Sequence, residues 1–189
     1  MPPSFTIVAA RIAAFRSASI ARVAGLFVTG LFVTGLLVMP LLGGPASAQP
    51  GRSVTFVDAQ GEVVAVLDRE ALEAVGRFEV RTNTPWDDDP VSYEGPLLRD
   101  LVDAVGFGDS AIIVHALNDY SSEIPSADMR DFDVILALRK DGEYMPIADM
   151  GPAFVVYPYD FDPRLRDRVY YARSVWQVSR IRQLPVAAE

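Results

Sequence analysis

Short apolar runs separated by glycine, proline, asparagine and aspartate dominate residues 49–189, and they limit this part of the chain to a fold built mainly from short strands. We expect strands over residues 53–57, 62–66, 77–82, 111–117, 133–138, 153–157 and 174–184. Helical spacing of apolar residues predicts helices over 68–75 and 96–105, and short helical turns are expected over 126–130 and 162–168. Residues 83–95 hold two prolines and three consecutive aspartates, which predicts a loop. Strands that outnumber the helices favour a single α+β domain with a mixed or antiparallel sheet over a doubly wound fold.

The first 48 residues have the composition of an export signal. Three arginines, Arg11, Arg16 and Arg22, precede an apolar stretch over residues 23–42, and no acidic residue occurs in this part of the chain. The small residues of Ala46-Ser47-Ala48 predict cleavage after Ala48, which would release the domain into the periplasm. The apolar stretch is nearly long enough to span a bilayer, so an uncleaved membrane anchor is the alternative. Both interpretations place the folded domain outside the cytoplasm.

The composition excludes several classes of function. The formal net charge is −8, and without the three arginines of the leader the remaining 14 basic residues face 25 acidic ones, a net charge of −11. Such a surface repels nucleic acid and anionic lipid. The chain has no cysteine and one histidine, which disfavours a zinc site and a Ser-His-Asp or Cys-His triad. His115 itself falls in an expected strand, and we interpret it as a packed strand residue.

A polar turn follows the strand expected over residues 111–117. The run is Ala116-Leu117-Asn118-Asp119-Tyr120-Ser121-Ser122-Glu123-Ile124-Pro125. Polar and aromatic side chains at the end of a buried strand are typical of a binding site carried on a loop. The alternative is that Asn118 and Asp119 only form the turn, through side-chain-to-backbone hydrogen bonds.

An ordered series of short motifs extends over about residues 80–184. It comprises Gly95-Pro96-Leu97-Leu98-Arg99, Asn118-Asp119-Tyr120, Asp141-Gly142-Glu143, Gly151-Pro152, Tyr157-Pro158 and Val175-Trp176-Gln177. In this order the motifs resemble the oxidoreductase molybdopterin-binding domain, the fold of sulfite oxidase and related periplasmic reductases. Enzymes of that family hold molybdenum through a cysteine thiolate that follows the strand before the Gly-x-x-Leu-Arg helix. The equivalent region here, residues 80–86, contains no cysteine, and a hydroxyl or amide oxygen is a poor substitute for that soft ligand.

The chain is similar to a subset of this family whose members are exported and free of cysteine. Some of them bind free reduced pterins in the periplasm and regulate a membrane receptor that carries cyclic-di-GMP synthesis and degradation domains. The resemblance implies an exported pterin-binding sensory protein that uses no metal and docks on such a receptor. Two alternatives stay open: a molybdopterin-dependent oxidoreductase with an atypical metal ligand, and a scaffold that binds only a partner protein.

A pterin site needs a carboxylate for the amide-like edge of the ring and aromatic side chains for its flat faces. The candidate carboxylates are Asp119 and Asp160. The candidate stacking or wall residues are Trp86, Tyr120, Tyr157, Tyr159 and Trp176. Asn118 and Arg173 are expected to bond the ring carbonyl and nitrogens.

Overall fold

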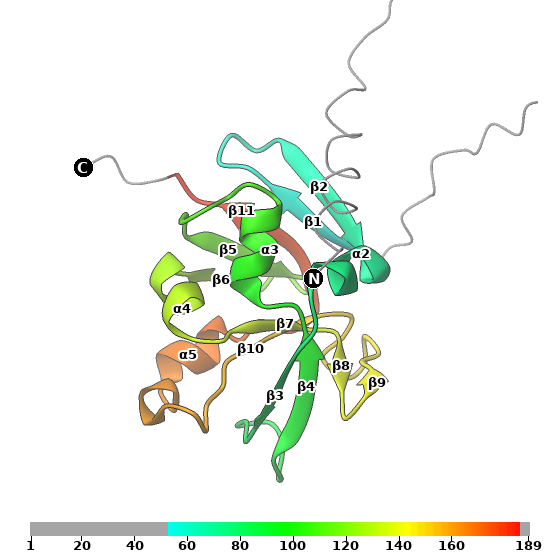
Figure 1. The fold of residues 1–189 in the computed structure, drawn as a ribbon, viewed down its shortest axis with the longest axis vertical. Coiled ribbons are helices and arrows are strands. Elements are labelled where there is room, and N and C mark those ends of the chain that lie inside the picture. Colours follow the sequence, from blue (N-terminus) through cyan, green and yellow to red (C-terminus); the bar gives the residue numbers. More distant parts are fainter. Residues whose placement is uncertain (1–52, 186–189) are drawn as a thin grey trace, which may run out of the picture.

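The computed structural model describes residues 53–185, and these residues form an α+β domain with mostly antiparallel sheets (Figure 1). The largest sheet has five strands in the order β2-β1-β11-β5-β6. Its strands are β1 (Ser53–Val57), β2 (Val63–Asp68), β5 (Ile112–Ala116), β6 (Ser121–Ile124) and β11 (Val178–Gln183). Neighbouring strands are antiparallel except β1 and β11, which pair in parallel. The expected α+β class with a mixed or antiparallel sheet is therefore confirmed, and the export signal expected over residues 1–48 lies outside the described range.

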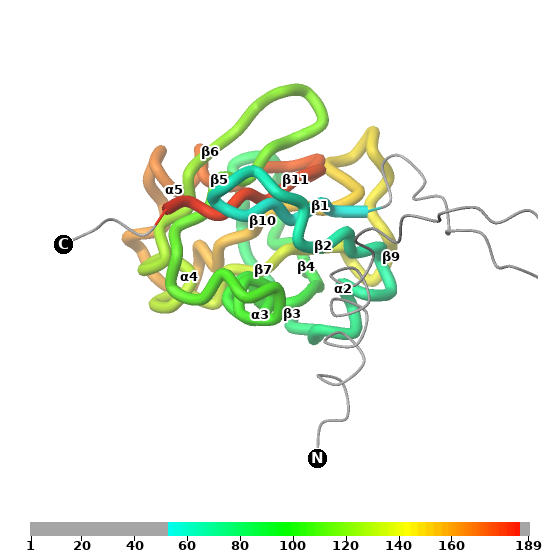
Figure 2. The backbone as a smooth tube through the Cα atoms, turned by 90° about the horizontal axis from the view of Figure 1, so that it is seen from above, coloured from blue at the N-terminus to red at the C-terminus, as the bar shows by residue number. Residues whose placement is uncertain are grey.

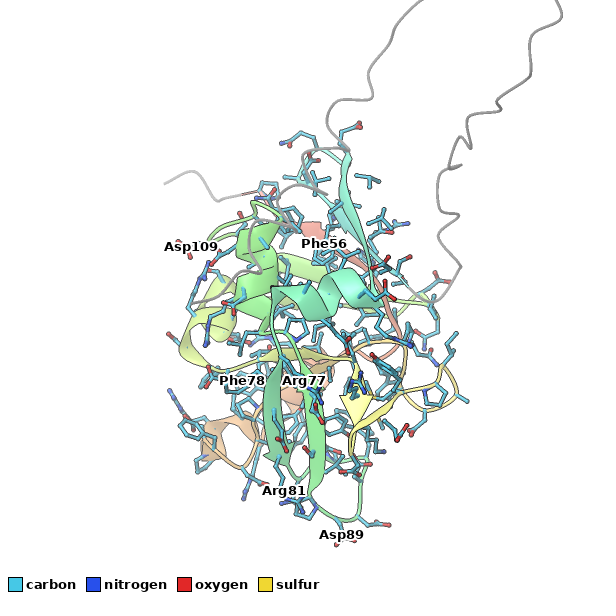
Figure 3. All side chains as sticks on the ribbon, turned by 45° about the vertical axis from the view of Figure 1, so that its right-hand side comes forward. Phe56, Arg77, Phe78, Arg81, Asp89 and Asp109 are labelled. Atoms are coloured by element: carbon cyan, nitrogen blue, oxygen red, sulfur yellow. The ribbon has the colours of Figure 1, made fainter. Side chains whose placement is uncertain are left out.

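Two smaller sheets complete the domain. The four-stranded sheet has the order β3-β4-β8-β9, with strands β3 (Phe78–Thr82), β4 (Val91–Gly95), β8 (Arg139–Lys140) and β9 (Glu143–Tyr144). β7 (Ile135–Ala137) pairs with β10 (Phe154–Val156). The β3–β4 hairpin projects from the body of the domain, and Asp89 lies at its tip (Figure 3).

The helices are short. They are α2 (Arg69–Val75), α3 (Leu98–Ala104), α4 (Ser126–Asp131), the 3-10 turn η1 (Pro163–Leu165) and α5 (Arg168–Arg173). Within residues 53–185, no helix has the length and apolar character needed to cross a membrane. α2 begins as expected, because Asp68 caps it by accepting the N–H of Ala71 at 2.9 Å. α2 and α3 lie on the same side of the five-stranded sheet (Figure 2).

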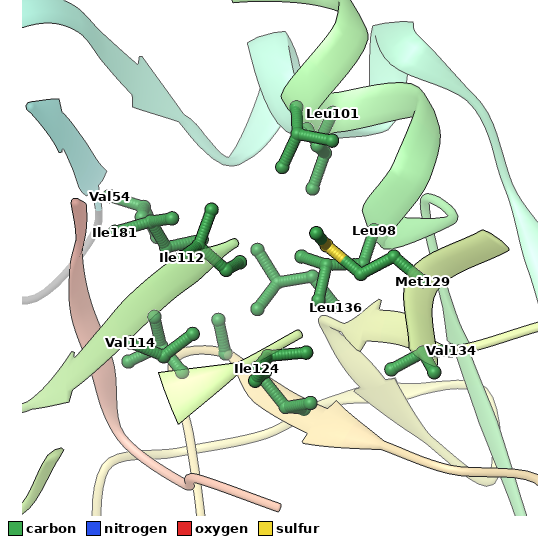
Figure 4. Close-up of a cluster of buried hydrophobic side chains, with 14 of the residues drawn as sticks. Val54, Leu98, Leu101, Ile112, Val114, Ile124, Met129, Val134, Leu136 and Ile181 are labelled. Atoms are coloured by element: carbon green, nitrogen blue, oxygen red, sulfur yellow. The ribbon is translucent and has the colours of Figure 1, made fainter. Parts of the chain in front are cut away.

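The main core lies between that sheet and the helices. Alternate residues of the central strands, such as Val54, Ile112 and Ile181, are buried against the apolar face of α3, which supplies Leu98 and Leu101 (Figure 4). A second core lies beneath the four-stranded sheet. It is formed by Val80, Val91, Tyr93, Ile135, Ala137, Met145, Phe154 and Val156, with Trp86 and Trp176 packed against it. The second core therefore supports both tryptophans of the chain.

Three expected boundaries are wrong. The expected loop over residues 83–95 ends at Pro90, and residues 91–95 form β4 instead. The alternating burial of β4 gives it a core face that the preceding prolines and aspartates obscured. The polar turn after β5 is shorter than expected, since β6 pairs with β5. The last strand begins only at Val178, because Gln177 adopts a left-handed φ of 54°. Trp176 therefore lies in a loop rather than in an alternating strand.

The polar segment expected to be helical over residues 162–168 is also different. Only η1 lies within it, and α5 begins at its last residue, Arg168. The side chain of Asp162 caps η1, and that of Asp167 caps α5. α5 continues to Arg173, which brings Tyr170 and Tyr171 onto a helix that the sequence did not predict.

Candidate functional site

A pocket of about 240 Å³ opens beside the second core. It is lined by Trp86, Asn118, Tyr120, Tyr171, Ser174, Val175 and Trp176. These residues come from the loop after β3, the turn between β5 and β6, helix α5, and the segment that joins α5 to β11. Four of the nine predicted site residues, Trp86, Asn118, Tyr120 and Trp176, therefore meet at one pocket.

Trp86 forms the centre of the aromatic wall. Its ring lies edge to face with Trp176, with a centroid distance of 5.5 Å and an angle of 90° between the planes. It makes similar contacts with Phe154 at 5.6 Å and with Tyr171 at 6.3 Å. Such pairs contribute about 0.5–1.5 kcal/mol each beyond the burial of their area. The wall is therefore held in place by packing before any ligand arrives.

A polar cluster fixes the loop that carries Trp86. The Trp86 N–H donates to Thr84 Oγ1 at 3.2 Å, and Thr84 Oγ1 donates to Asp87 Oδ2 at 2.8 Å. Asp87 also accepts from the Tyr93 hydroxyl at 2.6 Å and from Lys140 Nζ at 2.8 Å. Burial raises the pKa of Asp87, but the hydrogen bonds from Lys140, Tyr93 and Thr84 outweigh it and hold the pKa below its usual value. Asp87 is therefore an ionised anchor for the loop.

The turn between β5 and β6 forms the second wall. Asn118 Oδ1 accepts the N–H of Tyr120 at 3.2 Å, so the asparagine does form the side-chain-to-backbone turn. The Tyr120 hydroxyl donates to the carbonyl oxygen of Ala172 in α5 at 2.7 Å, which joins the turn to the opposite side of the pocket. Asp119 lies between these two lining residues with a left-handed φ of 65°. It is exposed and is not among the residues that line the pocket.

Tyr157, Tyr159 and Arg173 lie behind the pocket rather than in its wall. The Tyr157 hydroxyl and Arg173 Nη1 both donate to Asp128 Oδ2, at 2.8 and 2.7 Å. The Tyr159 hydroxyl bonds Ser174 Oγ, which in turn donates to the carbonyl oxygen of Tyr170 at 3.0 Å. Burial raises the pKa of both Tyr157 and Tyr159 far above the usual value, so both hydroxyls stay protonated. These residues act on the pocket by fixing Ser174 and the end of α5.

The Asp160 carboxylate forms its hydrogen bonds outside the pocket. It accepts from the backbone N–H and the side-chain amide of Asn83, both at 2.8 Å, and from Arg166 Nη2 at 2.6 Å. Burial raises the pKa of Asp160, but the hydrogen bonds from Asn83 and Arg166 have the larger effect. The pKa of Asp160 therefore lies below its usual value. The residue ties the loop after β3 to the loop after β10, and it is not among the lining residues.

Strained backbone surrounds the pocket. Asp119, Met150 and Gln177 have φ values of 65°, 60° and 54°, a conformation that non-glycine residues rarely adopt. Asp119 and Gln177 each follow a lining residue, and the Gln177 N–H donates to the carbonyl oxygen of Met150 at 2.9 Å. Asp141, the fourth non-glycine residue with a left-handed φ in the described part of the chain, lies in the turn between β8 and β9 instead. Such backbone costs about 1–3 kcal/mol per residue and occurs often at binding sites and in turns.

Three lining residues, Tyr171, Ser174 and Val175, were not predicted. Tyr171 belongs to α5, the helix that the polar sequence around it concealed. Ser174 and Val175 follow it without a distinctive pattern, although Tyr170-Tyr171 between two arginines is an aromatic pair that could have indicated a wall.

The residues at this site do not fit a molybdenum held by a thiolate. The sequence has no cysteine, and Thr84, in the region where the family places that ligand, has its hydroxyl bonded to Asp87. Within the described part of the chain, His, Asp and Glu side chains nowhere gather in a group of three that could hold a metal ion.

The described residues form an α+β domain whose fold is similar to part of a larger solved protein. One solved structure with a similar fold is the sulfane dehydrogenase SoxCD from Paracoccus pantotrophus, with a TM-score of 0.52 and 16% sequence identity. The match covers 72% of this chain and 39% of that chain, so this protein spans well under half of it. At this identity the likeness shows the fold alone. No family model and no curated protein matches the sequence.

Proposed function

We propose that this protein binds a free pterin in the aromatic pocket and uses no metal. The observation that carries the proposal is the convergence of both tryptophans of the chain, Trp86 and Trp176, with Tyr120 and Tyr171 around one opening. Aromatic side chains recognise a flat heteroaromatic ring through its faces. The fixed edge-to-face packing of Trp86 supports a preformed site, which reduces the ordering cost of binding.

The size and charge of the pocket favour a small ring over a large cofactor. Its volume of about 240 Å³ lies below the ~300–1,000 Å³ of sites for drug-sized ligands. Each of the described residues that line it is uncharged. An anionic phosphate tail such as that of molybdopterin would find no basic partner in that lining, whereas a neutral bicyclic pterin fits it.

The polar edge of the ring is assigned to the turn between β5 and β6. Asn118 Oδ1 already accepts a backbone N–H, which leaves its amide nitrogen to donate to a ring carbonyl. Asp160 is satisfied by Asn83 and Arg166. Neither predicted carboxylate lines the pocket, but Asp119 lies between the lining residues Asn118 and Tyr120. Asp119 is therefore the better placed of the two for the amide-like edge of the pterin. An Asp119→Ala substitution should weaken binding by about 1.5–3 kcal/mol, the contribution of hydrogen bonds to a charged group.

A second part of the proposal is that the protein is exported and reports its ligand to a membrane receptor. Exposed apolar side chains near the pocket support a docking rim: Leu117, Tyr120 and Ile147 are 45%, 46% and 48% exposed. The backbones of Leu117 and Ile147 both hydrogen bond Gln177, which follows Trp176. A partner seated there would contact the same turn that contacts the ligand.

Intrinsic fluorescence tests the ligand directly, because the only two tryptophans of the chain line the pocket. Adding a reduced pterin to the protein should quench this fluorescence and saturate. Trp86→Ala should weaken binding by about 1 kcal/mol or more, whereas Phe161→Ala, which removes an aromatic ring that is 85% exposed and outside the pocket, should leave it unchanged. Absence of saturable quenching by any pterin would refute the proposal. Acid release from natively purified protein, followed by mass analysis, identifies the natural ligand.

The rival function is a molybdopterin-dependent oxidoreductase, which the fold shared with a dehydrogenase favours. It predicts stoichiometric molybdenum in protein purified from its native host. A scaffold without a small ligand predicts neither metal nor pterin, and partner binding that survives Trp86→Ala.

A further inference from the structure

The outward face of the five-stranded sheet carries three basic or titratable side chains side by side. His115 on β5 lies directly opposite Arg180 on β11, and Arg182 follows two residues further along the same face of β11. The alternate residues Val114 and Ile181 are fully buried in the core, and successive side chains of a strand point to opposite faces. These three side chains therefore belong to the face away from that core. α2 and α3 cover the core side of the sheet (Figure 2). Side chains directly opposite across a strand pair lie about 5 Å apart at Cβ, close enough to share one ligand.

These charges are not balanced by protein carboxylates. Within residues 53–185, neither Arg180 nor Arg182 forms an ion pair, although eight other basic side chains do. The residues outside that range include a single acidic side chain, Glu189. Arg182 Nε is also buried without a hydrogen-bond partner among the described residues. A buried N–H without a partner is costly, and no hydrogen bond within the described residues satisfies Arg182.

We propose that His115, Arg180 and Arg182 form a binding site for a compact oxyanion, that is, a phosphate or carboxylate group. Guanidinium groups present paired N–H donors that match such oxygens, and a protonated imidazole adds a third donor. None of the three side chains lines the aromatic pocket, so this site stands apart from the proposed pterin site. The strands hold the three Cα positions rigidly, as a preformed site requires.

The neighbouring side chains in the sheet include few charged groups. In the sheet register, uncharged Thr55 and Val57 on β1 lie opposite Arg180 and Arg182. On the other side, β6 places Ser121 opposite His115 and Glu123 opposite Ile113. Glu123 is thus the nearest acidic residue in this register, and it lies two strands away from Arg182.

The imidazole provides a spectroscopic readout. Partial burial and the charges of Arg180 and Arg182 lower the pKa of His115. A bound anion offsets those charges and favours the protonated ring, so the pKa should rise on binding and the anion should bind more tightly at lower pH.

The test uses the protein without a histidine tag, because His115 is then its only histidine and gives one set of imidazole NMR signals. The His115 pKa is measured at constant ionic strength with increasing inorganic phosphate, and in a second series with acetate. A saturable rise of about half a pKa unit or more in either series supports the site and names the preferred group. If the His115 pKa shows no saturable rise in either series, the proposed anion site is overturned.

Matched variants separate a specific site from general charge. The Arg180→Gln and Arg182→Gln variants should each weaken phosphate or acetate binding about tenfold, as expected for a lost charged hydrogen bond. Arg168→Gln, which removes an exposed arginine from α5, should leave binding unchanged. Arg180 is exposed, so its variant tests the site even where the Arg182 variant fails to fold. An equal loss in the Arg168 variant would overturn the proposal.

Discussion

Replacing Asp87 by alanine should lower the free energy of unfolding by about 2–3 kcal/mol. The carboxylate accepts hydrogen bonds from Thr84, Tyr93 and Lys140, at 2.6–2.8 Å. The Tyr93 side chain is fully buried and cannot turn its hydroxyl to water, so the loss of its acceptor costs about 1–3 kcal/mol. Lys140 is partly exposed and regains water, so its ion pair adds only about 0–1 kcal/mol.

Urea unfolding followed by tryptophan fluorescence at neutral pH measures this loss. Asp88→Ala is the control, because Asp88 is an exposed carboxylate on the same loop and its loss should change stability by less than about 0.5 kcal/mol. If Asp87→Ala also stays within about 0.5 kcal/mol of the wild type, the polar cluster does not anchor the loop of Trp86.

The pH dependence tests the same anchor. The folded pKa of Asp87 lies below the usual 3.8, so the unfolded chain takes up the proton first as the pH falls. The stability that the ionised Asp87 contributes is therefore complete above about pH 5 and is lost as the pH drops through the folded pKa. The difference in stability between wild type and Asp87→Asn should shrink over that acid range. A difference that does not change with pH would contradict the ionised anchor.

Three further changes test the fold and the turn. Leu101→Ala should cost about 2–5 kcal/mol in urea unfolding, because Leu101 is fully buried in the main core; a smaller loss would mean that the core collapses to fill the space. Gly95→Ala should cost about 3 kcal/mol or prevent folding, because a Cβ there would lie 2.0 Å from the carbonyl oxygen of Leu136. Gly76→Ala is the control, because its Cβ would enter open space. In thermal melting its stability should stay within about 1 kcal/mol of the wild type. Equal effects of the two glycine changes would contradict this reasoning. Tyr120→Phe removes the hydrogen bond to α5 and should speed amide exchange in the turn between β5 and β6 by about two- to tenfold; unchanged exchange would show that the turn is held by other contacts.

Local signals were sufficient for much of the fold. The expected strand over 53–57 and the helix capped by Asp68 are confirmed, because alternation and capping are encoded by neighbouring residues. β4 was missed because its apolar face is defined only by the second core, which distant strands complete. α5 was missed because none of its residues is fully buried, so its sequence carries no apolar stripe.

The same distinction applies to the pocket. Trp86, Asn118, Tyr120 and Trp176 were found because aromatic and polar residues in loops stand out in a sequence. Tyr157 and Tyr159 look equally suitable in the sequence, yet hydrogen bonds to Asp128 and Ser174 hold them in the core. Which tyrosine faces a pocket depends on partners far away in the chain, and the spacing of residues along the sequence does not contain that information.

The parallel pairing of β1 with β11 has a consequence for how the domain forms. Thr55 pairs with Arg180, and β11 lies between β1 and β5 in the middle of the sheet. A chain made from its N-terminus therefore holds two separate parts of a sheet, with unpaired strand edges, until its final strand emerges. Contacts of such long sequence separation form slowly, and exposed edges invite pairing with other chains in the meantime. We therefore expect the nascent domain to be protected from aggregation only once β11 has joined the two parts of the sheet.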